Sequence, residues 1–270
     1  MVSGSVLKLR QEGDVLRCSA GSDHLDSSSV SRYFRLDVDL EHVLSTLSKD
    51  EAITRAIESY YGLRIVRQDT WECLASFVLA TNANIPRIKK MVAAVCARYG
   101  TSFEFEGDSY ATFPTPEALG AASESDLVGC GLGYRAPFLR RVAISVAEGK
   151  VDFDLLANLE YVESRKLLMK ELLGQKLLLG VGPKVADCVL LYSCGKDEAF
   201  PIDVWIAKVI GKSYPRLLGP ELRKRFAAEG KAKLSPSDYD KISKRVRSYF
   251  GAYAGYAQQY LFMAAREQGL

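Results

Sequence analysis

The sequence predicts a mainly α-helical protein with a small antiparallel β element at its N-terminus. Residues 4–19 alternate apolar and polar side chains on either side of a turn at Glu12–Asp14, the pattern of a β-hairpin. From about Leu36 to the C-terminus, apolar residues recur with the spacing of amphipathic helices. The 270 residues, 48% hydrophobic and 26% charged, have the composition of an ordinary globular chain. We therefore expect a short β domain at 1–35 and a helical body at 36–270.

The remaining elements follow in order along the chain. Residues 21–30 are rich in serine and aspartate and predict a loop. The predicted helices begin at a capping residue or a proline, or end at a glycine, and Asp69 is one such N-cap. They span 39–48, 50–62, 69–81, 85–100, 115–123, 124–131, 135–149, 163–175, 236–251 and 255–269. Another helix begins near Pro183, which predicts a helical hairpin over 163–195. We expect the helices within 206–270 to pack back on 36–62.

Charge and cysteine content exclude several classes of protein. The net charge of +3 is too small to imply a polyanionic partner by itself. Basic clusters at 87–90, 135–141 and 208–247 are either solvated faces or phosphate contacts. The six cysteines form no CxxC pair and no cluster run, so we expect free thiols in a reducing compartment, without zinc or an iron–sulfur cluster. No run of 18 apolar residues predicts a membrane span, and the N-terminus lacks the core of a signal peptide.

A glycine-punctuated turn precedes an apolar helix in LLGVGPKVADC, residues 178–188. Glycines such as Gly180 and Gly182 allow positive φ and close approach of a backbone, and Pro183 suits the first turn of a helix. The exposed amides of such a turn, Gly180–Gly182 with Val181 between them, can hold a DNA phosphate without reading sequence. The alternative is an ordinary corner between two helices, and the turn alone does not decide between them.

Lys184 and Asp203 are charged residues in two otherwise apolar segments. Burial and the positive end of a helix both favour the neutral amine of Lys184, the form that acts as a nucleophile. Cys188 lies four residues on, on the same helical face. Asp203 follows Pro201 in FPIDVW, where a carboxylate can accept a proton or stabilise a developing cation. The alternative is an ion pair that only satisfies two half-buried charges.

These residues resemble a known family. The motif GVGPKVADC followed by PIDV is similar to the helix–hairpin–helix–Gly/Pro–Asp superfamily of base-excision DNA glycosylases, and within it to the 8-oxoguanine DNA glycosylase branch. Similar stretches occur in the same order at 32–40, 62–88, 131–139, 178–188, 200–204 and 251–262. The resemblance covers nearly the whole chain from about residue 30, and it implies the fold and the activity of that branch.

The resemblance also implies a role for each matching residue. Lys184 matches the catalytic lysine that attacks C1′, and Asp203 matches the essential aspartate. The residues that match the base pocket are Cys188, Gln258 and Phe262, those that match the gap and the opposite base are Asn82, Arg87, Tyr134 and Arg135, and those that match the phosphate clamp are Gly180, Val181 and Gly182. Ordinary roles remain open for several: Asn82 as the cap of the 85–99 helix, Tyr134 and Phe262 as core, and the arginines as solvated side chains.

Some positions depart from the family pattern. Trp205 stands where relatives carry a histidine near the phosphate, Ala265 replaces the acid that partners this histidine, and Leu179 replaces the usual proline of the hairpin. No segment matches the early G-Q-x-F-R-W of relatives, whose backbone carbonyl senses the proton that oxidation adds to guanine. The N-terminal domain is therefore expected to be short or truncated, which bears on specificity more than on activity.

The resulting prediction is a bifunctional DNA glycosylase and abasic-site lyase that removes 8-oxoguanine opposite cytosine. It is expected to act as a monomer on double-stranded DNA inside the cell, in the cytoplasm or nucleoid of a prokaryote or in the nucleus of a eukaryote. Catalysis requires no metal or cofactor, although the carbonyls of the hairpin could bind a monovalent or calcium ion. Two alternatives are a lyase of the same superfamily for another damaged base and a non-catalytic hairpin module that binds DNA.

Overall fold

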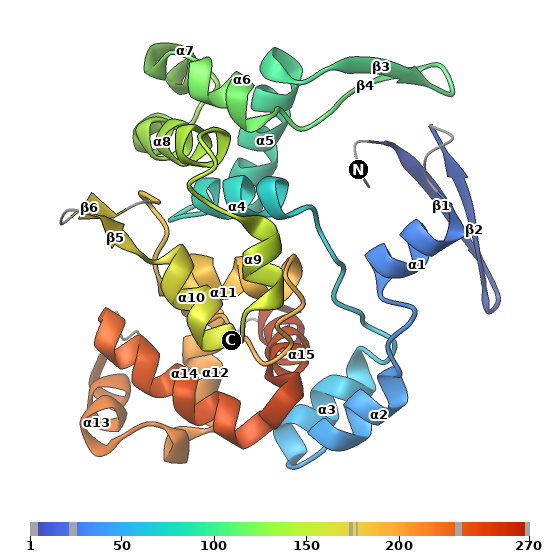
Figure 1. Ribbon diagram of the computed structural model, residues 1–270. Helices are drawn as coiled ribbons and strands as arrows, with labels where there is room; N and C mark the ends of the chain where they lie inside the picture. Colours follow the sequence, from blue (N-terminus) through green and yellow to red (C-terminus); the bar gives the residue numbers. More distant parts are fainter. Residues whose placement is uncertain (1–4, 22–25, 173–174, 177, 230–233, 268–270) are drawn as a thin grey trace. The chain divides into compact units, whose positions relative to one another are not determined.

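The computed structural model describes residues 5–21, 26–172, 175–176, 178–229 and 234–267. Its contacts divide the chain into two compact units. The first contains 1–36, 67–153 and 170–180, and the second contains 37–66, 154–169 and 181–270. The segment 36–270, which we expected as one helical body, is thus divided between the two units. Figure 1 labels the elements of both.

The first unit begins with the predicted β-hairpin. Strands β1 (Leu7–Glu12) and β2 (Val15–Ala20) pair antiparallel, with Leu7 opposite Ala20 and Glu12 opposite Val15. The predicted loop at 21–30 is partly wrong, because helix α1 occupies Ser27–Phe34. The side chain of Asp26 caps α1 by accepting from the Ser29 amide. The Ser/Asp-rich composition of this segment thus reflects the start of a helix, where these residues are also favoured.

The helices of the first unit agree with the sequence pattern. They are α4 (Thr70–Leu79), α5 (Ile85–Tyr99), α6 (Pro116–Ala121), α7 (Glu124–Gly129) and α8 (Ala136–Ala147), the last preceded by a short 3₁₀ turn, η1 (Gly133–Arg135). Asp69 caps α4 as predicted, by accepting from the Glu72 amide. Helix α4 is buried along most of its length, and Trp71 anchors it by donating to the Pro114 carbonyl at 2.8 Å.

Two further hairpins were not expected from the sequence. Strands β3 (Ser102–Phe105) and β4 (Asp108–Ala111) pair after α5. The helix predicted at 163–175 ends early, because α10 covers only Tyr161–Leu168 and the short strands β5 (Glu171–Leu172) and β6 (Gln175–Lys176) follow. The apolar spacing continues past Leu168 without a glycine or proline until Gly174, so periodicity alone gave no stop signal.

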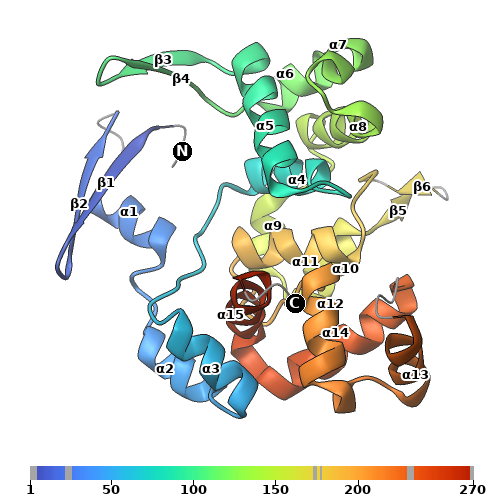
Figure 2. The ribbon, with the colours of Figure 1, turned by 180° about the vertical axis from the view of Figure 1, so that it is seen from behind.

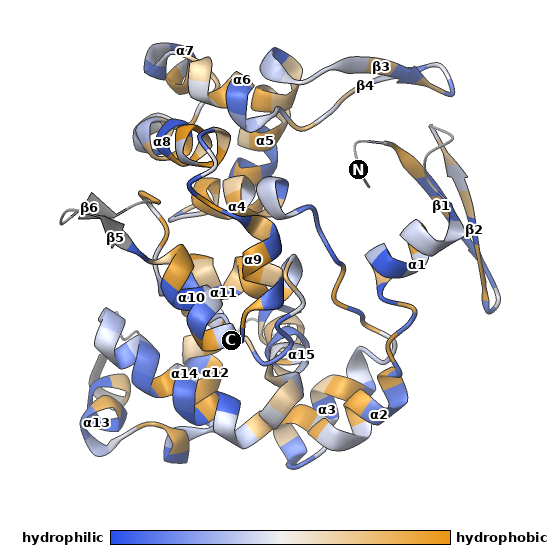
Figure 3. Cartoon of the chain, viewed as in Figure 1, coloured by the Kyte–Doolittle hydropathy of each residue, from blue (hydrophilic) through white to orange (hydrophobic). Residues whose placement is uncertain are grey.

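The second unit is all helical in its described part. It contains α2 (Leu40–Leu47), α3 (Glu51–Ser59), α9 (Phe153–Asn158, which starts at the unit boundary), α10, α11 (Pro183–Tyr192), α12 (Val204–Ser213), η2 (Pro215–Leu217), α13 (Pro220–Glu229), α14 (Pro236–Phe250), η3 (Gly251–Tyr253) and α15 (Ala254–Glu267). Figure 2 shows α11, α12, α14 and α15 together from behind, and contacts join α15 to both α12 and α14. In Figure 3 much of α14 is coloured as hydrophilic, and its buried residues are Tyr239, Ile242, Ser243, Val246 and Phe250.

The segment 37–66 contacts the C-terminal helices. The Tyr260 hydroxyl donates to the Leu63 carbonyl at 3.0 Å, and helix α15 packs on α3. The Asp50 carboxylate caps α3 and also accepts from the hydroxyls of Tyr214 (3.1 Å) and Tyr249 (2.9 Å). These contacts tie the two ends of the second unit together around one apolar core.

A close helix contact positions α15 against α11. A Cβ added to Gly255 would lie 2.2 Å from the Leu191 side chain and 2.8 Å from the Asp197 carbonyl, so only glycine fits there. The Gly255 amide donates to that same carbonyl at 2.7 Å. This contact fixes the height of α15 beside α11, the helix that carries Lys184.

Candidate active site

The turn before α11 leaves the amides at the helix start available. Gly180 has φ +83°, and an added Cβ would lie 3.1 Å from the Phe138 ring. Gly182 has φ −103°, in the extended region, so the expectation of positive φ holds at Gly180 and is wrong at Gly182. Gly182 is the N-cap of α11, and no side chain of the described residues caps the helix. The first-turn amides are therefore not satisfied by a side chain, as an anion site requires.

Lys184 and Asp203 lie at the starts of two helices and line one cavity. Lys184 is in the first turn of α11, and Asp203 is the N-cap of α12. The Asp203 carboxylate accepts from the amides of Trp205 (3.0 Å) and Ile206 (2.8 Å). The cavity, of about 330 Å³, is lined by Pro183, Lys184, Ile202, Asp203, Val204, Ala207, Leu234, Ser235, Pro236 and Tyr239. It is mostly apolar, with the amine and the carboxylate as its charged groups among the described residues.

Burial dominates the electrostatics of this site. It raises the pKa of Asp203 above the ordinary value, while the Ile206 amide, the Lys184 charge and the Trp205 amide act in the opposite direction. Burial also raises the pKa of Cys188 to about 11, against the attraction and hydrogen bond of Lys184. Cys188 is 2% exposed, so its thiol remains protonated at neutral pH. Lys184, Cys188 and Asp203 therefore interact with one another at this site.

Gln258 and Phe262 lie on α15, one helical turn apart. Gln258 is 4% exposed, and its Oε1 atom has no hydrogen-bond partner among the described residues. A buried amide oxygen without a donor is uncommon in a native core and calls for an explanation such as a ligand. Phe262 is half-buried, so the alternative role as a core residue accounts for only part of its side chain. Neither residue lines the cavity of Lys184 and Asp203.

Asn82 and Tyr134 form a small polar contact in the first unit. Asn82 is exposed and has φ +50°, an uncommon conformation for a non-glycine residue. Its Nδ2 donates to the Tyr134 hydroxyl at 3.2 Å, and that hydroxyl donates to the Thr81 carbonyl at 3.1 Å. The cap of α5 is Asn84, and Tyr134 is 51% exposed. The ordinary roles considered for Asn82, as a cap, and for Tyr134, as core, are therefore wrong.

The two arginines expected beside Tyr134 differ in their surroundings. Arg87 is exposed on α5, and its Nη2 atom would lie 4.0 Å from a Cβ added to Gly133. Arg135 is 1% exposed and donates through Nε to the Thr81 carbonyl at 2.8 Å and through Nη2 to the carbonyls of Thr81 and Asn82. The alternative of a solvated Arg135 is wrong, and most of the donors of Arg135 hold the turn that carries Asn82.

The departures from the family pattern are found on α12 and α15. Trp205 is half-buried next to Asp203, with the Lys208 ammonium 5.0 Å from its ring centroid. Ala265 is completely buried on α15. The basic cluster at 135–141 is not a common surface, because Arg135 is buried and Arg140 donates to the Ala122 carbonyl at 2.9 Å.

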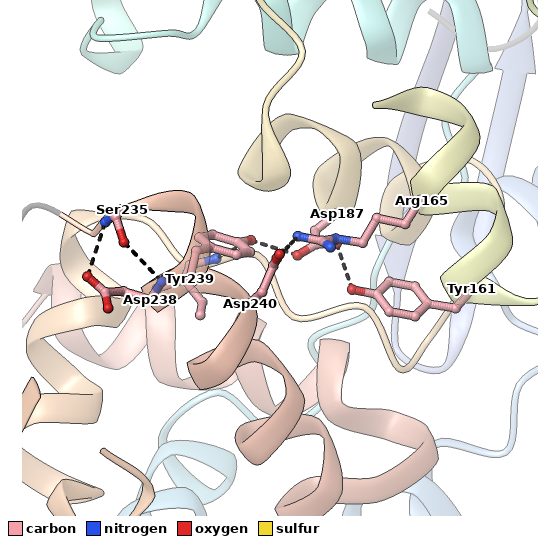
Figure 4. Close-up of polar contacts among 8 residues, drawn as sticks. Tyr161, Arg165, Asp187, Ser235, Asp238, Tyr239 and Asp240 are labelled. Carbon is pink, nitrogen blue, oxygen red and sulfur yellow. Dashed lines mark hydrogen bonds and ion pairs between the residues drawn. The ribbon is translucent and has the colours of Figure 1, made fainter. Parts of the chain in front are cut away.

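An aromatic and an acidic residue lie behind the site, and neither was predicted from the sequence. Tyr239 of α14 lines the cavity of Lys184 and Asp203, and its hydroxyl is bonded to the buried carboxylate of Asp187 (Figure 4). The signal that could have found Asp187 is the spacing KVAD, which places an acid three residues after Lys184 inside an apolar helix. No group of three or more His, Cys, Asp or Glu side chains within the described parts of the chain could hold a metal ion. None of the helices described there is long and apolar enough to cross a membrane.

Comparison with known families identifies the chain. A family model described as the N-terminal domain of 8-oxoguanine DNA glycosylase matches residues 1–74, beyond the boundary expected near residue 35. A second model, described as HhH-GPD superfamily base excision DNA repair protein, matches residues 75–216, more than half of the chain. The chain belongs to the HhH-GPD superfamily of base excision DNA repair proteins.

This HhH-GPD protein is similar to curated enzymes over almost its whole length. It is 30% identical to a probable N-glycosylase/DNA lyase of Methanothermobacter thermautotrophicus, over 98% of this chain and 83% of that protein. It is 33% identical to the N-glycosylase/DNA lyase of Saccharomyces cerevisiae, over 96% of this chain and 73% of that protein. Among solved structures, the 8-oxoguanine glycosylase/lyase of Clostridium acetobutylicum on DNA with cytosine opposite 8-oxoguanine superposes with a TM-score of 0.81. That match has 29% identity and covers 98% of this chain and 82% of the other.

Proposed function

We propose that this HhH-GPD protein removes 8-oxoguanine opposite cytosine from duplex DNA and then cleaves the strand at the abasic site. The observation that carries the proposal is the pair formed by Lys184 and Asp203, an amine and a carboxylate at two helix starts that line one cavity. Phosphate binding alone would need neither group at this depth. The names of the yeast and archaeal relatives as N-glycosylase/DNA lyase agree with both steps of the reaction.

The reaction assigns one role to each group. The neutral amine of Lys184 attacks C1′ of the deoxyribose, and the bond from C1′ to the base breaks with its electron pair leaving on the base, which takes up a proton. Asp203 stabilises the positive charge that develops at the sugar and accepts the proton that the amine loses. The sugar ring opens to a Schiff base with Lys184. Loss of a C2′ proton then expels the phosphate on the 3′ side and nicks the strand.

The base pocket is proposed to be formed by Cys188, Gln258 and Phe262. The buried Oε1 of Gln258 is an acceptor for an N–H on the edge of the flipped base, since it has no donor among the described residues. The half-buried ring of Phe262 offers one apolar wall. The thiol of Cys188, protonated because burial raises its pKa to about 11, offers the opposite wall without adding charge.

Asn82, Tyr134, Arg87 and Arg135 are proposed to hold the DNA where the base has left. Asn82 is exposed in a turn that Arg135 fixes by donating to the carbonyls of Thr81 and Asn82. Tyr134 is half-exposed beside it and serves as the wedge. Arg87, with its exposed guanidinium, presents donors and no acceptor, which matches the O2 and N3 acceptors of cytosine. Arg135 has fewer donors free for the base than Arg87 does.

The turn at Gly180, Val181 and Gly182 is proposed to hold a backbone phosphate. The amides of the first turn of α11 lack a side-chain cap, and the positive end of the helix favours an anion. Carbonyl groups of the same turn could serve a monovalent or calcium ion, because such ions take oxygen ligands and need no cysteine or histidine. Catalysis by Lys184 and Asp203 does not depend on this ion.

A panel of duplexes that each carry one damaged base tests the proposal, with base release and strand nicking scored separately. We expect release of 8-oxoguanine opposite cytosine, nicking, and covalent trapping of the protein on this DNA by borohydride. Lys184→Gln should abolish trapping. Lys212→Gln, an exposed lysine in the last turn of α12, is the matched control and should trap normally.

Each other outcome has a definite meaning. Trapping of Lys184→Gln at the yield of the native protein would identify another amine as the nucleophile. Preferred release of a different base would make the chain a lyase of the same superfamily with another substrate. DNA binding without release of any base would make it a non-catalytic hairpin module. An enzyme of genomic repair works where the DNA is, in the cytoplasm or nucleoid of a prokaryote or the nucleus of a eukaryote.

A further inference from the structure

The hydroxyl of Tyr239 joins the two segments that carry Lys184 and Asp203. It donates to Asp187 Oδ2 at 2.7 Å and accepts from the Ile202 amide at 3.1 Å. Asp187 lies on α11 three residues after Lys184, and Ile202 directly precedes Asp203. Figure 4 shows the Tyr239 ring of α14 with its hydroxyl directed at Asp187. One hydroxyl thus connects helix α11, which carries Lys184, to the segment that ends at Asp203.

The Asp187 carboxylate is held in place by several hydrogen bonds. It is completely buried and accepts three hydrogen bonds, from the hydroxyls of Tyr161 (2.8 Å) and Tyr239 and from Arg165 Nε (2.8 Å). Arg165 is held in turn by Asp240 at 2.7 Å. A buried acceptor with three donors has little freedom to move, because each displacement weakens several hydrogen bonds.

The Tyr239 hydroxyl keeps its proton in this environment. Burial and the neighbouring Asp187 carboxylate raise the pKa of Tyr239 well above its ordinary value. The hydroxyl therefore donates to Asp187 throughout the neutral range, and its oxygen remains the acceptor for the buried Ile202 amide. Without it, the segment 201–203 would have to shift to satisfy that amide elsewhere.

We propose that Tyr239 is a positioning residue that sets Asp203 relative to Lys184 in the reaction proposed above, on which this inference rests. Tyr239 acts through the Ile202 amide and not by contact with the substrate. Its ring lines the cavity of Lys184 and Asp203, but its hydroxyl faces Asp187. A misplacement of about 1 Å of a catalytic group can slow a reaction by about 10²-fold. Tyr239→Phe is therefore expected to slow base release by roughly ten- to a hundredfold.

Tyr161 provides a matched control on the same carboxylate. Tyr161→Phe and Tyr239→Phe each remove one phenol donor from Asp187 and keep the aromatic ring. Only Tyr239 is also bonded to the Ile202 amide and lines the cavity. Damage to the buried network alone should therefore appear equally in both variants, whereas an effect on Asp203 should appear in Tyr239→Phe only.

The experiment measures single-turnover release of 8-oxoguanine opposite cytosine with protein in excess, over a range of protein concentrations. For Tyr239→Phe we expect a lower plateau rate with an unchanged half-saturating concentration, since positioning affects the chemical step and not binding. Tyr161→Phe should keep the native plateau rate within about twofold, even if its Tm falls by as much as that of Tyr239→Phe. Equal slowing of both variants, or a native plateau for Tyr239→Phe, would overturn the proposal.

Hydrogen exchange at the Ile202 amide adds a measurement on the native protein that needs no variant. The amide should be strongly protected, and fast exchange would remove the bond on which the proposal depends. Native protein that releases no base from any duplex of the panel would refute the proposed function. If the native protein releases the base and Tyr239→Phe releases it at the same rate, only the role of Tyr239 is refuted.

Discussion

Replacement of Asp203 separates its structural role from its chemical role. The carboxylate is the N-cap of α12, where it accepts from the Trp205 and Ile206 amides at 3.0 and 2.8 Å. Asparagine can accept the same two bonds, and it is as good an N-cap as aspartate. Alanine cannot accept them. Asp203→Asn therefore removes the charge and keeps the cap, whereas Asp203→Ala removes both.

Loss of the cap and loss of the buried charge are expected to change stability in opposite directions. Loss of an N-cap typically costs about 1 kcal/mol, so Asp203→Ala should unfold roughly 2–4 °C below Asp203→Asn. Burial raises the pKa of Asp203, which means that its ionised form is less favourable in the folded than in the unfolded protein. Asp203→Asn removes that unfavourable charge, so at neutral pH its Tm should equal or exceed that of the native protein.

The pH dependence follows from the same raised pKa. Native stability from Asp203 is complete below the unfolded pKa of about 4 and is lost as the pH rises through the higher folded pKa. The advantage of Asp203→Asn should therefore grow over this window and stay constant above it. Both variants should lose about 10²-fold or more in base release, because removal of an electrostatic group from an active site typically costs this much.

Thermal unfolding from pH 4 to 8 and single-turnover base release test these expectations together. If Asp203→Asn is less stable than the native protein at neutral pH, the ionised carboxylate contributes net stability. The conclusion that burial outweighs the hydrogen bonds in setting the pKa of Asp203 would then be wrong. If Asp203→Asn releases the base at the native rate, Asp203 is only a cap.

Three further outcomes are expected from the geometry. Gly180→Ala should lower Tm and weaken binding of duplex DNA, because a side chain at φ +83° costs about 1–2 kcal/mol and the new Cβ meets Phe138. Gly182→Ala should keep the native Tm, because this residue has φ −103° and open space for a Cβ. Mass mapping after alkylation at pH 7.5 should find Cys188 unmodified, since its pKa is raised to about 11 and it is buried; its modification at the rate of a free thiol would contradict this. Arg87→Ala should narrow the preference for cytosine over adenine opposite 8-oxoguanine by about one to two powers of ten, the size of one charge-assisted hydrogen bond, and an unchanged preference would return Arg87 to a solvated role.

Local signals predicted most of the helices. Asp69 and Pro86 stand at helix starts, and Gly100 ends a helix, where the structure has these boundaries. These local signals failed where contacts between distant segments determine the secondary structure. The strand pair β3–β4 is short and only partly buried, and nothing in the sequence ends α10 at Leu168. Composition also misled at 21–30, since serine and aspartate occur both in loops and at helix starts.

The candidate site was predictable to the extent that its residues are close in sequence or carry a motif. Lys184 and Asp203 were singled out from their polarity in apolar segments, and the structure lines one cavity with both. Tyr239 was not found, because it lies more than thirty residues farther along and resembles any core aromatic of α14. Arg135 was matched to an arginine that contacts the cytosine, with a solvated side chain as the alternative. Sequence cannot reveal that the carbonyls of Thr81 and Asn82 use its guanidinium.

The lone carbonyl of Gln258 has a consequence for how a ligand is selected. Oε1 belongs to a side chain that is only 4% exposed, and it has no hydrogen-bond partner among the described residues. A ring edge that offers an N–H gains nearly the full interaction, while an edge that offers only acceptors meets an uncompensated repulsion at low dielectric. In the role proposed for Gln258, this buried acceptor therefore selects for a ligand that donates a hydrogen bond to it. If Gln258 reads the base as proposed, an apolar side chain at this position should raise the Tm and weaken the selection between bases.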